Sequence, residues 1–172
     1  AAAGTPHLLT LPALLAEHEP RLSFGTWVGG DRDGHPLVTA ETTRQTLLDL
    51  RSKALDLLHE QLTELSRKLS LSRLTQPLPP ALTLHIAQAA EQLGETGRQA
   101  VQRNAEEPWR QFANLIQARL PDVAAAPLAY AQPDALVQDL RLLYDSLVEI
   151  GARRLADADV RPVIRSAQTF GF

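Results

Sequence analysis

The segment from Gly29 to Pro36 reads GGDRDGHP and concentrates the residue types that could do chemistry. Successive backbone N–H groups in a glycine-rich turn form a concavity that binds anions. Arg32, in the middle of the segment, adds a planar and permanently charged group suited to phosphate or carboxylate. The same residues are also compatible with a structural turn in which Arg32 pairs with Asp31 or Asp33. On residue types alone both interpretations stay open.

Other phosphate and metal motifs do not fit this segment. A Walker loop needs Lys followed by Ser or Thr, and the dinucleotide-binding fingerprint needs a different glycine spacing. The pair Asp31-x-Asp33 is similar to the start of a calcium loop. However, Gly34 takes the fourth place instead of the sixth, and Thr42 stands where the glutamate of the twelfth place belongs. We therefore do not expect a calcium site.

The other candidate groups are scattered along the chain. The five histidines show neither an HExxH motif nor close pairing. His35 directly follows the turn and is the histidine placed to take part in a site, whereas His59 and His85 are expected at the surface or at the edge of the core. The two glutamates before Pro108 indicate the start of a helix more than a catalytic pair. Since no group of His, Asp and Glu has the spacing of metal ligands, the chain itself is expected to bind no metal.

The composition indicates a globular and helix-rich chain. Of the 172 residues, 44% are hydrophobic and 5% aromatic, and the net charge is −3. Charges of both signs are interspersed, so no basic face for nucleic acid is expected. The absence of cysteine excludes disulfides and thiolate sites and fits a reducing, cytoplasmic compartment. No apolar run approaches about 18 residues, and so no membrane span is expected.

A long amphipathic helix is expected directly after the turn. Thr39 is placed to cap it, Glu41 favours its positive end, and nothing breaks the pattern from Ala40 to about Ser70. Apolar residues recur every three or four positions and form a stripe, at Leu47, Leu50, Ala54, Leu58, Leu62, Leu65 and Leu69. Because a single helix of this length is not stable in water, it needs partner helices.

Further helices are predicted over 81–93, 98–120 and 134–155 from the spacing of their apolar residues. Residues 98–120 form either one helix or a broken pair, because Pro108 is tolerated only near a helix start or at a kink. Gly94 and Gly97 are expected to interrupt the chain between the first two. The three prolines of residues 121–133 predict a loop before the third.

The two ends of the chain are predicted to have different secondary structure. Asp157 or Asp159 is expected to cap a last short helix that runs through Ser166. Loose alternation from Leu22 to Val28 predicts one short strand, and residues 1–20 are expected to be an irregular lead-in. The predicted fold class is mainly α, with a helical unit over residues 21–172.

The segment from Phe24 to Thr39, FGTWVGGDRDGHPLVT, resembles the signature F-x-S-W-x-G-G-D-R-D-G-N-P-x-V-T of phosphoenolpyruvate carboxylases. Weaker similarity continues at Glu107-Pro108-Trp109-Arg110, which resembles the family's E-P-Y-R. It continues again from Leu140 to Gly151 and at Phe170-Gly171. The order of these matches is that of one uninterrupted internal portion of the family. The resemblance therefore covers nearly the whole chain from Arg21 on.

This resemblance implies a fold and an activity. Family members are much longer, mostly helical enzymes built around a parallel β-barrel. The chain would then be a helical bundle-like fragment with at most one short strand of an incomplete parallel barrel. The enzymes use Mg²⁺ or Mn²⁺ to join bicarbonate to phosphoenolpyruvate, and they release oxaloacetate and phosphate. For the complete enzyme the resemblance implies a cytoplasmic homo-oligomer.

The resemblance also implies roles for residues of the turn. The signature arginine helps to hold the phosphate end of the substrate, a role that would fall to Arg32. The residues that shape its turn would be Gly29, Gly30, Asp31, Asp33 and Gly34. His35 stands where the family has asparagine and Thr26 where it has serine. Hydrogen bonding around position 35 is therefore expected to differ from that of the family.

Several parts of the family's machinery have no match in this sequence. These are the catalytic histidine, the metal-binding carboxylates, the other phosphate-binding arginines and the glycine-rich mobile loop. We therefore expect no catalytic residue and no activity in the chain alone, and exposed apolar surface on its leucine-rich helix. The other hypothesis is a free-standing helical binding or scaffold module derived from the carboxylase. The apolar ending Phe170-Gly171-Phe172 favours the fragment.

Overall fold

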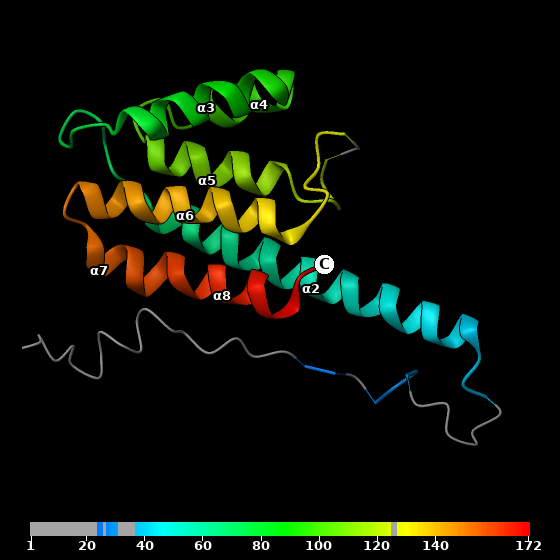
Figure 1. Ribbon diagram of the computed structural model, residues 1–172. Helices are drawn as coiled ribbons and strands as arrows, with labels where there is room; N and C mark the ends of the chain where they lie inside the picture. Colours follow the sequence, from blue (N-terminus) through cyan, green and yellow to red (C-terminus); the bar gives the residue numbers. More distant parts are fainter. Residues whose placement is uncertain (1–23, 26, 31–36, 125–126) are drawn as a thin grey trace, which may run out of the picture.

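The computed structural model describes residues 24–25, 27–30, 37–124 and 127–172, and this part of the chain is built from helices (Figure 1). Helical segments cover more than half of the sequence, which confirms the predicted mainly α class. No strand occurs among the described residues. This agrees with the prediction of at most one short strand. The segment expected to form it is described only at residues 24–25 and 27–28, and Val28 lies in a turn closed by a hydrogen bond of 3.4 Å from the Gly30 N–H to the Trp27 carbonyl. The predicted lead-in lies outside the described residues.

Helix α2 (Ala40–Lys68) is the longest element and begins as its sequence predicts. The Thr39 hydroxyl accepts the Thr42 N–H at 3.2 Å, and Glu41 occupies the first turn. The apolar stripe is buried from Ala54 onward, at Ala54, Leu55, Leu58, Leu62 and Leu65. Its first members are exposed, because the N-terminal half of α2 extends beyond the other helices (Figure 1).

Helices α3 (Pro80–Gln92), α4 (Gly94–Gln102) and α5 (Pro108–Ala118) follow the proline-rich connector. Gly94 has φ +58 and separates α3 from α4, as expected. Gly97 does not interrupt the chain. It is buried within α4, where a Cβ atom would lie only 2.3 Å from the Ala90 carbonyl oxygen. Gly97 is therefore needed for the close approach of α3 and α4 rather than for a turn.

The predicted helix over 134–155 is two elements, because Gly151 has φ +81 and ends the first one. Helix α6 (Pro133–Glu149) is followed by a continuous run of α7 (Arg153–Leu155), the π-helical turn η1 (Ala156–Val160) and α8 (Arg161–Phe170). Asp157 and Asp159 lie inside η1 and cap no helix, which corrects the sequence-based expectation.

The core forms around α5, which packs against α2, α3, α4 and α6 (Figure 1). Trp109 and Phe112 of α5 are its largest fully buried side chains. The Trp109 indole N–H donates to the Ser146 hydroxyl of α6 at 3.1 Å, so the one polar atom of this ring is satisfied. The large apolar residues of the predicted helix over 98–120 are buried, at Trp109, Phe112, Leu115 and Ile116 of α5 and at Leu120 just after it.

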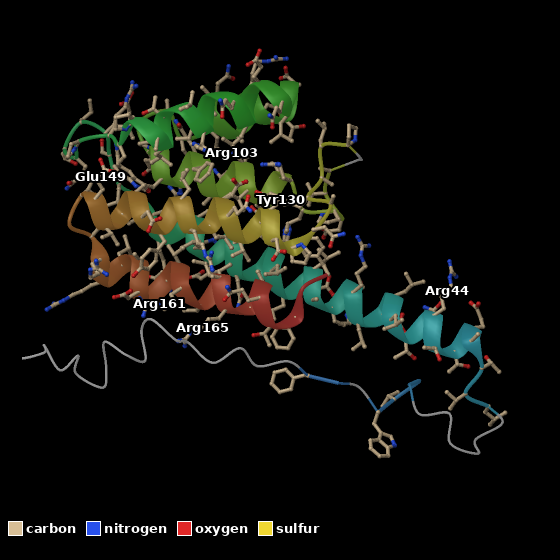
Figure 2. The ribbon with its side chains drawn as sticks, viewed as in Figure 1. Arg44, Arg103, Tyr130, Glu149, Arg161 and Arg165 are labelled. Atoms are coloured by element: carbon tan, nitrogen blue, oxygen red, sulfur yellow. The ribbon has the colours of Figure 1, made fainter. Side chains whose placement is uncertain are left out.

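Hydrogen bonds among Arg119, Tyr130 and Asp139 hold the connection between α5 and α6 in place. Figure 2 labels Tyr130 beside this connection. The Tyr130 hydroxyl donates to Asp139 at 2.6 Å, and Arg119 donates to the same carboxylate at 2.8 Å. Burial and the adjacent Asp139 carboxylate raise the pKa of Tyr130 well above its ordinary value, so the hydroxyl stays protonated as a donor. None of the helices among the described residues is long and apolar enough to cross a membrane.

Candidate functional site

The candidate site is the glycine-rich turn that precedes α2, of which the structure describes the beginning. Gly29 has φ +70, a conformation in which L-residues with a side chain are strained. A Cβ atom on Gly29 would lie 2.2 Å from the Thr46 Oγ1 atom and 2.8 Å from its Cβ. Two separate requirements, the backbone angle and the close approach to α2, therefore make glycine necessary at this position.

Threonines of the first turns of α2 hold both flanks of residues 31–36. The Thr43 hydroxyl donates to the Gly29 carbonyl at 2.7 Å. The Thr42 hydroxyl donates to the Leu37 carbonyl at 3.1 Å. Since Thr42 and Thr43 are neighbours, the backbone before and after the segment is fastened to one place, the N-terminal turn of α2.

Of the predicted site residues, Gly29 and Gly30 are described, and Asp31, Arg32, Asp33, Gly34 and His35 lie outside the described residues. The role of Gly29 and Gly30 in shaping the turn around Arg32 stays a prediction. Thr43 and Thr46 were not predicted from the sequence as residues of the site. A signal was present, because Thr42, Thr43 and Thr46 follow the capping Thr39 inside the first turns of a helix, where threonine has low helix propensity.

An apolar groove of about 620 Å³ lies beside the beginning of the turn. Phe24 and Phe170 stack across it with ring centroids 5.9 Å apart, and Leu47 and Leu50 of α2 line it. Arg44, on the same end of α2, is 70% exposed and points away from the helical bundle (Figure 2). Arg44 pairs with the exposed Glu41 at 3.8 Å, and Lys53 also lines the groove. The described surroundings of the turn therefore combine an apolar wall with solvent-exposed charged side chains.

The second matching motif, Glu107-Pro108-Trp109-Arg110, forms a structural junction between α2 and α5. Arg110 donates from Nε to the Ser66 carbonyl at 2.8 Å and pairs with Glu107 at 2.7 Å. It thereby satisfies a carbonyl of the last turn of α2, which has no partner within the helix. Hydrogen bonds from the Ser70 hydroxyl and then from Arg110 lower the pKa of Glu107. All three nitrogens of the Arg110 guanidinium therefore donate to residues of this junction, which gives Arg110 a structural role.

Two close pairs of carboxylates in the described part of the chain, Glu106 with Glu107 and Asp157 with Asp159, are bound to cations. Glu106 pairs with Arg73 at 2.7 Å, a hydrogen bond that lowers the pKa of Glu106. Asp159 pairs with Lys68 at 2.8 Å, and Asp157 pairs with Arg161. Within the described part of the chain, no three His, Asp or Glu side chains come together in a group that could hold a metal ion. These residues do not fit the divalent metal that the resemblance implies.

The two histidines expected to be ordinary are placed on helices away from the turn. His59 is exposed on α2, and His85 is half-buried on α3. The His85 ring packs edge-on against Phe112 with centroids 6.5 Å apart. The His85 Nδ1 atom lies 2.9 Å from the Ala81 carbonyl oxygen, and the His59 Nε2 atom lies 3.4 Å from the Gln117 side-chain amide. Both positions are those of surface or core-edge residues.

Comparisons with known proteins agree on one family. The family model described as phosphoenolpyruvate carboxylase matches residues 8–172, beginning before the motif that carries the resemblance. The chain is 33% identical to the phosphoenolpyruvate carboxylase of Methylorubrum extorquens over 96% of its own length and 19% of that protein. It is 34% identical to the enzyme of Xanthomonas campestris, with 95% of this chain and 18% of that protein covered. For the enzyme of Caulobacter vibrioides the identity is 34%, over 89% of this chain and 18% of that protein. The chain thus spans less than a fifth of the length of these relatives.

Proposed function

The chain belongs to the phosphoenolpyruvate carboxylase family, and we propose that it forms part of an enzyme that carboxylates phosphoenolpyruvate. The reaction joins bicarbonate to phosphoenolpyruvate and yields oxaloacetate and inorganic phosphate. The family match over residues 8–172 is the observation that carries this proposal.

Within that enzyme, we assign the phosphate end of the substrate to Arg32. A guanidinium presents parallel N–H donors that match two phosphate oxygens and stays charged at every physiological pH. The described flanks support the assignment, because Gly29 and Leu37 are both bonded to the N-terminal turn of α2. Gly30, Asp31, Asp33 and Gly34 would complete the turn, and the histidine at position 35 would alter its hydrogen bonding.

The divalent metal of the reaction, Mg²⁺ or Mn²⁺, would be held by residues outside this chain. The support for this is the resemblance, because the family's metal-binding carboxylates have no match in this sequence. Among the described residues, the carboxylates of Glu106 and Asp159 are paired with Arg73 and Lys68. The contribution of the chain is to bind and orient the substrate's phosphate on a helical scaffold.

The same proposal extends to the surroundings of the enzyme. Phosphoenolpyruvate and bicarbonate are the substrates, the complete enzyme is a homo-oligomer, and its location is cytoplasmic. Nucleic acid and membranes are not among its partners. The even mixture of charges and the net charge of −3 support this reading.

Activity of the complete polypeptide tests the proposal. Oxaloacetate is measured by coupling it to a malate dehydrogenase and following NADH, with phosphoenolpyruvate present and bicarbonate added or withheld. We expect oxaloacetate formation that requires both substrates and a divalent metal, and none from the 172-residue chain alone. A folded complete polypeptide that forms no oxaloacetate would contradict the proposed function.

A further inference from the structure

We propose that Thr43 is a positioning residue for the substrate-binding turn. Its hydroxyl holds the Gly29 carbonyl and so fixes the place from which the chain continues toward Arg32. This inference rests on the proposed function, because it assumes that Arg32 binds the substrate's phosphate. It adds a residue of α2 that the family resemblance does not single out.

The hydrogen bond from Thr43 to Gly29 is short and joins two elements. The Thr43 Oγ1 atom lies 2.7 Å from the Gly29 carbonyl oxygen and 3.2 Å from the carbonyl oxygen of Thr39 in its own helix. A hydroxyl has a single hydrogen to donate, and the shorter contact is the better position for it. The bond also spans fourteen residues of sequence, so it reports tertiary rather than local structure.

The shape of Gly29 makes this contact specific. With φ +70 and without a side chain, Gly29 approaches α2 so closely that an added Cβ would overlap Thr46. The carbonyl of a bulkier residue could not reach Thr43 along the same path. The hydrogen bond from Thr43 and the lack of a side chain on Gly29 therefore allow the turn to pack against two successive turns of α2.

The bond is half of a paired arrangement. The neighbouring Thr42 holds the Leu37 carbonyl at 3.1 Å on the other side of residues 31–36. The backbone on both sides of that segment is thus bonded to the same end of α2, whose first turn is capped by Thr39. An arginine that binds phosphate through two parallel donors depends on such placement, since small displacements of a binding group cost much of its effect on the rate.

The test compares variants of the complete enzyme in kcat/KM for phosphoenolpyruvate. Thr43→Val keeps the branched shape and removes the hydroxyl, and we expect kcat/KM to fall about 3- to 10-fold, the effect of one hydrogen bond. Thr43→Ser retains the hydroxyl, and we expect it to stay within about twofold of the parent enzyme, since the donor remains. Melting temperatures measured on the same samples report on folding.

Thr83→Val is the matched control. Thr83 is the fourth residue of α3 as Thr43 is of α2, and its hydroxyl also donates to the carbonyl four residues earlier, at 3.2 Å. It has no bond to the turn. We expect Thr83→Val to leave kcat/KM unchanged, so that loss of activity in Thr43→Val reflects the contact with Gly29 rather than the loss of a helical threonine.

A double variant separates positioning from a merely structural effect. If Thr43 acts through Arg32, Thr43→Val should lower kcat/KM no further in an Arg32→Ala background. Independent, multiplying losses would overturn the inference, and so would a Thr43→Val enzyme as active as the Thr83→Val control while Arg32→Ala is strongly impaired. An Arg32→Ala enzyme with the activity of the parent would instead overturn the proposed role of Arg32 itself.

Discussion

At the scale of single residues, Glu107 and Arg110 show how a motif shared with an enzyme family can be structural. Arg110 reaches from the start of α5 to the carbonyl of Ser66 at the end of α2, and Glu107 holds the guanidinium in place. Asn104 also donates to the Glu107 carboxylate, at 3.1 Å. Together with Ser70 and Arg110, three side chains therefore donate hydrogen bonds to this carboxylate. Such a carboxylate is stabilised in its charged form.

Acid should therefore remove the contribution of Glu107 to stability. Because the folded-state pKa of Glu107 is lowered from 4.5, its contribution is fully present above pH 4.5 and is lost as the pH falls through the folded-state value. We expect Glu107→Gln to lower the free energy of unfolding by about 1–2 kcal/mol at pH 7, with the difference from the parent chain closing toward pH 3. Urea denaturation of the 172-residue chain at several pH values measures it.

Glu91→Gln serves as the control for this experiment, since Glu91 is exposed on α3. It should follow the parent chain across the whole pH range. A Glu107→Gln chain with the same stability as the parent at pH 7 would show that the junction between α2 and α5 does not depend on this carboxylate.

At the scale of elements, the two ends of α2 contact different parts of the chain. Its first turn anchors the glycine-rich turn through Thr42 and Thr43, and its last turn is completed by Arg110 of α5. At 1.5 Å per residue, a helix of 29 residues separates these ends by about 43 Å. The anchoring end lies outside the core, and the completed end lies within it.

The elements also show what a sequence can and cannot predict. The Thr39 cap, the apolar stripe of α2 and the buried face of α5 follow from local spacing and were predictable. The role of Gly97 was not, because glycine lowers helix propensity everywhere and only the packing of α3 on α4 makes it necessary. The π-helical turn η1 could not be predicted from the sequence for a related reason. Its Ala-Asp-Ala-Asp sequence has no local signature, and Lys68 and Arg161 pair with its carboxylates only in the folded chain.

Part of the candidate site could likewise be predicted from the sequence, and part could not. The glycines and Arg32 stand out by residue type, so a polar, phosphate-binding turn could be proposed from sequence. The bond from Thr43 to Gly29 joins residues of different elements, and no local pattern fixes that pairing. The threonines at the start of α2 were a signal that such a contact exists, without indicating its partner.

Replacing Gly97 tests the close packing of α3 and α4. In Gly97→Ala the new methyl group would overlap backbone atoms of Ala90, which cannot turn aside as a flexible side chain would. We expect the free energy of unfolding to fall by about 1–3 kcal/mol, despite the better helix propensity of alanine. Urea denaturation of the 172-residue chain measures the change.

Gly25→Ala is the comparison for this substitution, because nothing lies within 4 Å of an added Cβ there and its φ is not positive. Its stability should stay within about 0.5 kcal/mol of the parent chain. Stabilisation by Gly97→Ala would mean that the two helices do not approach as closely as described.

At the scale of the whole molecule, apolar side chains on the described surface gather where α2 leaves the bundle. Leu47 is 58% exposed and Leu50 is 45% exposed, and both line the groove beside Phe24 and Phe170. Since the chain spans less than a fifth of its relatives' length, other parts of a complete carboxylase are available to cover this surface. In the 172-residue chain it faces solvent.

Exposure of this surface should be measurable. We expect the chain to bind a hydrophobic dye and to self-associate as its concentration rises. The double variant Leu47→Glu/Leu50→Glu should lower both dye fluorescence and the average mass by light scattering. Leu84→Glu changes a leucine of α3 that is 54% exposed and lies away from the groove, and it should have little effect. Equal effects of the two changes would show that this surface is not a distinct apolar patch.

The central claim, that Arg32 serves the substrate's phosphate, concerns the complete enzyme, and one variant tests it most directly. Catalytic efficiency for phosphoenolpyruvate and melting temperature are measured on the same Arg32→Ala sample, with Arg32→Lys beside it. Loss of one charge-assisted phosphate contact costs about 2–4 kcal/mol, so we expect kcat/KM to fall about 30- to 1000-fold while the melting temperature stays unchanged. Arg32→Lys should restore the efficiency only in part, because the planar pair of donors is lost. A lower melting temperature with unchanged kcat/KM in Arg32→Ala would contradict the account and make Arg32 a structural residue of its turn.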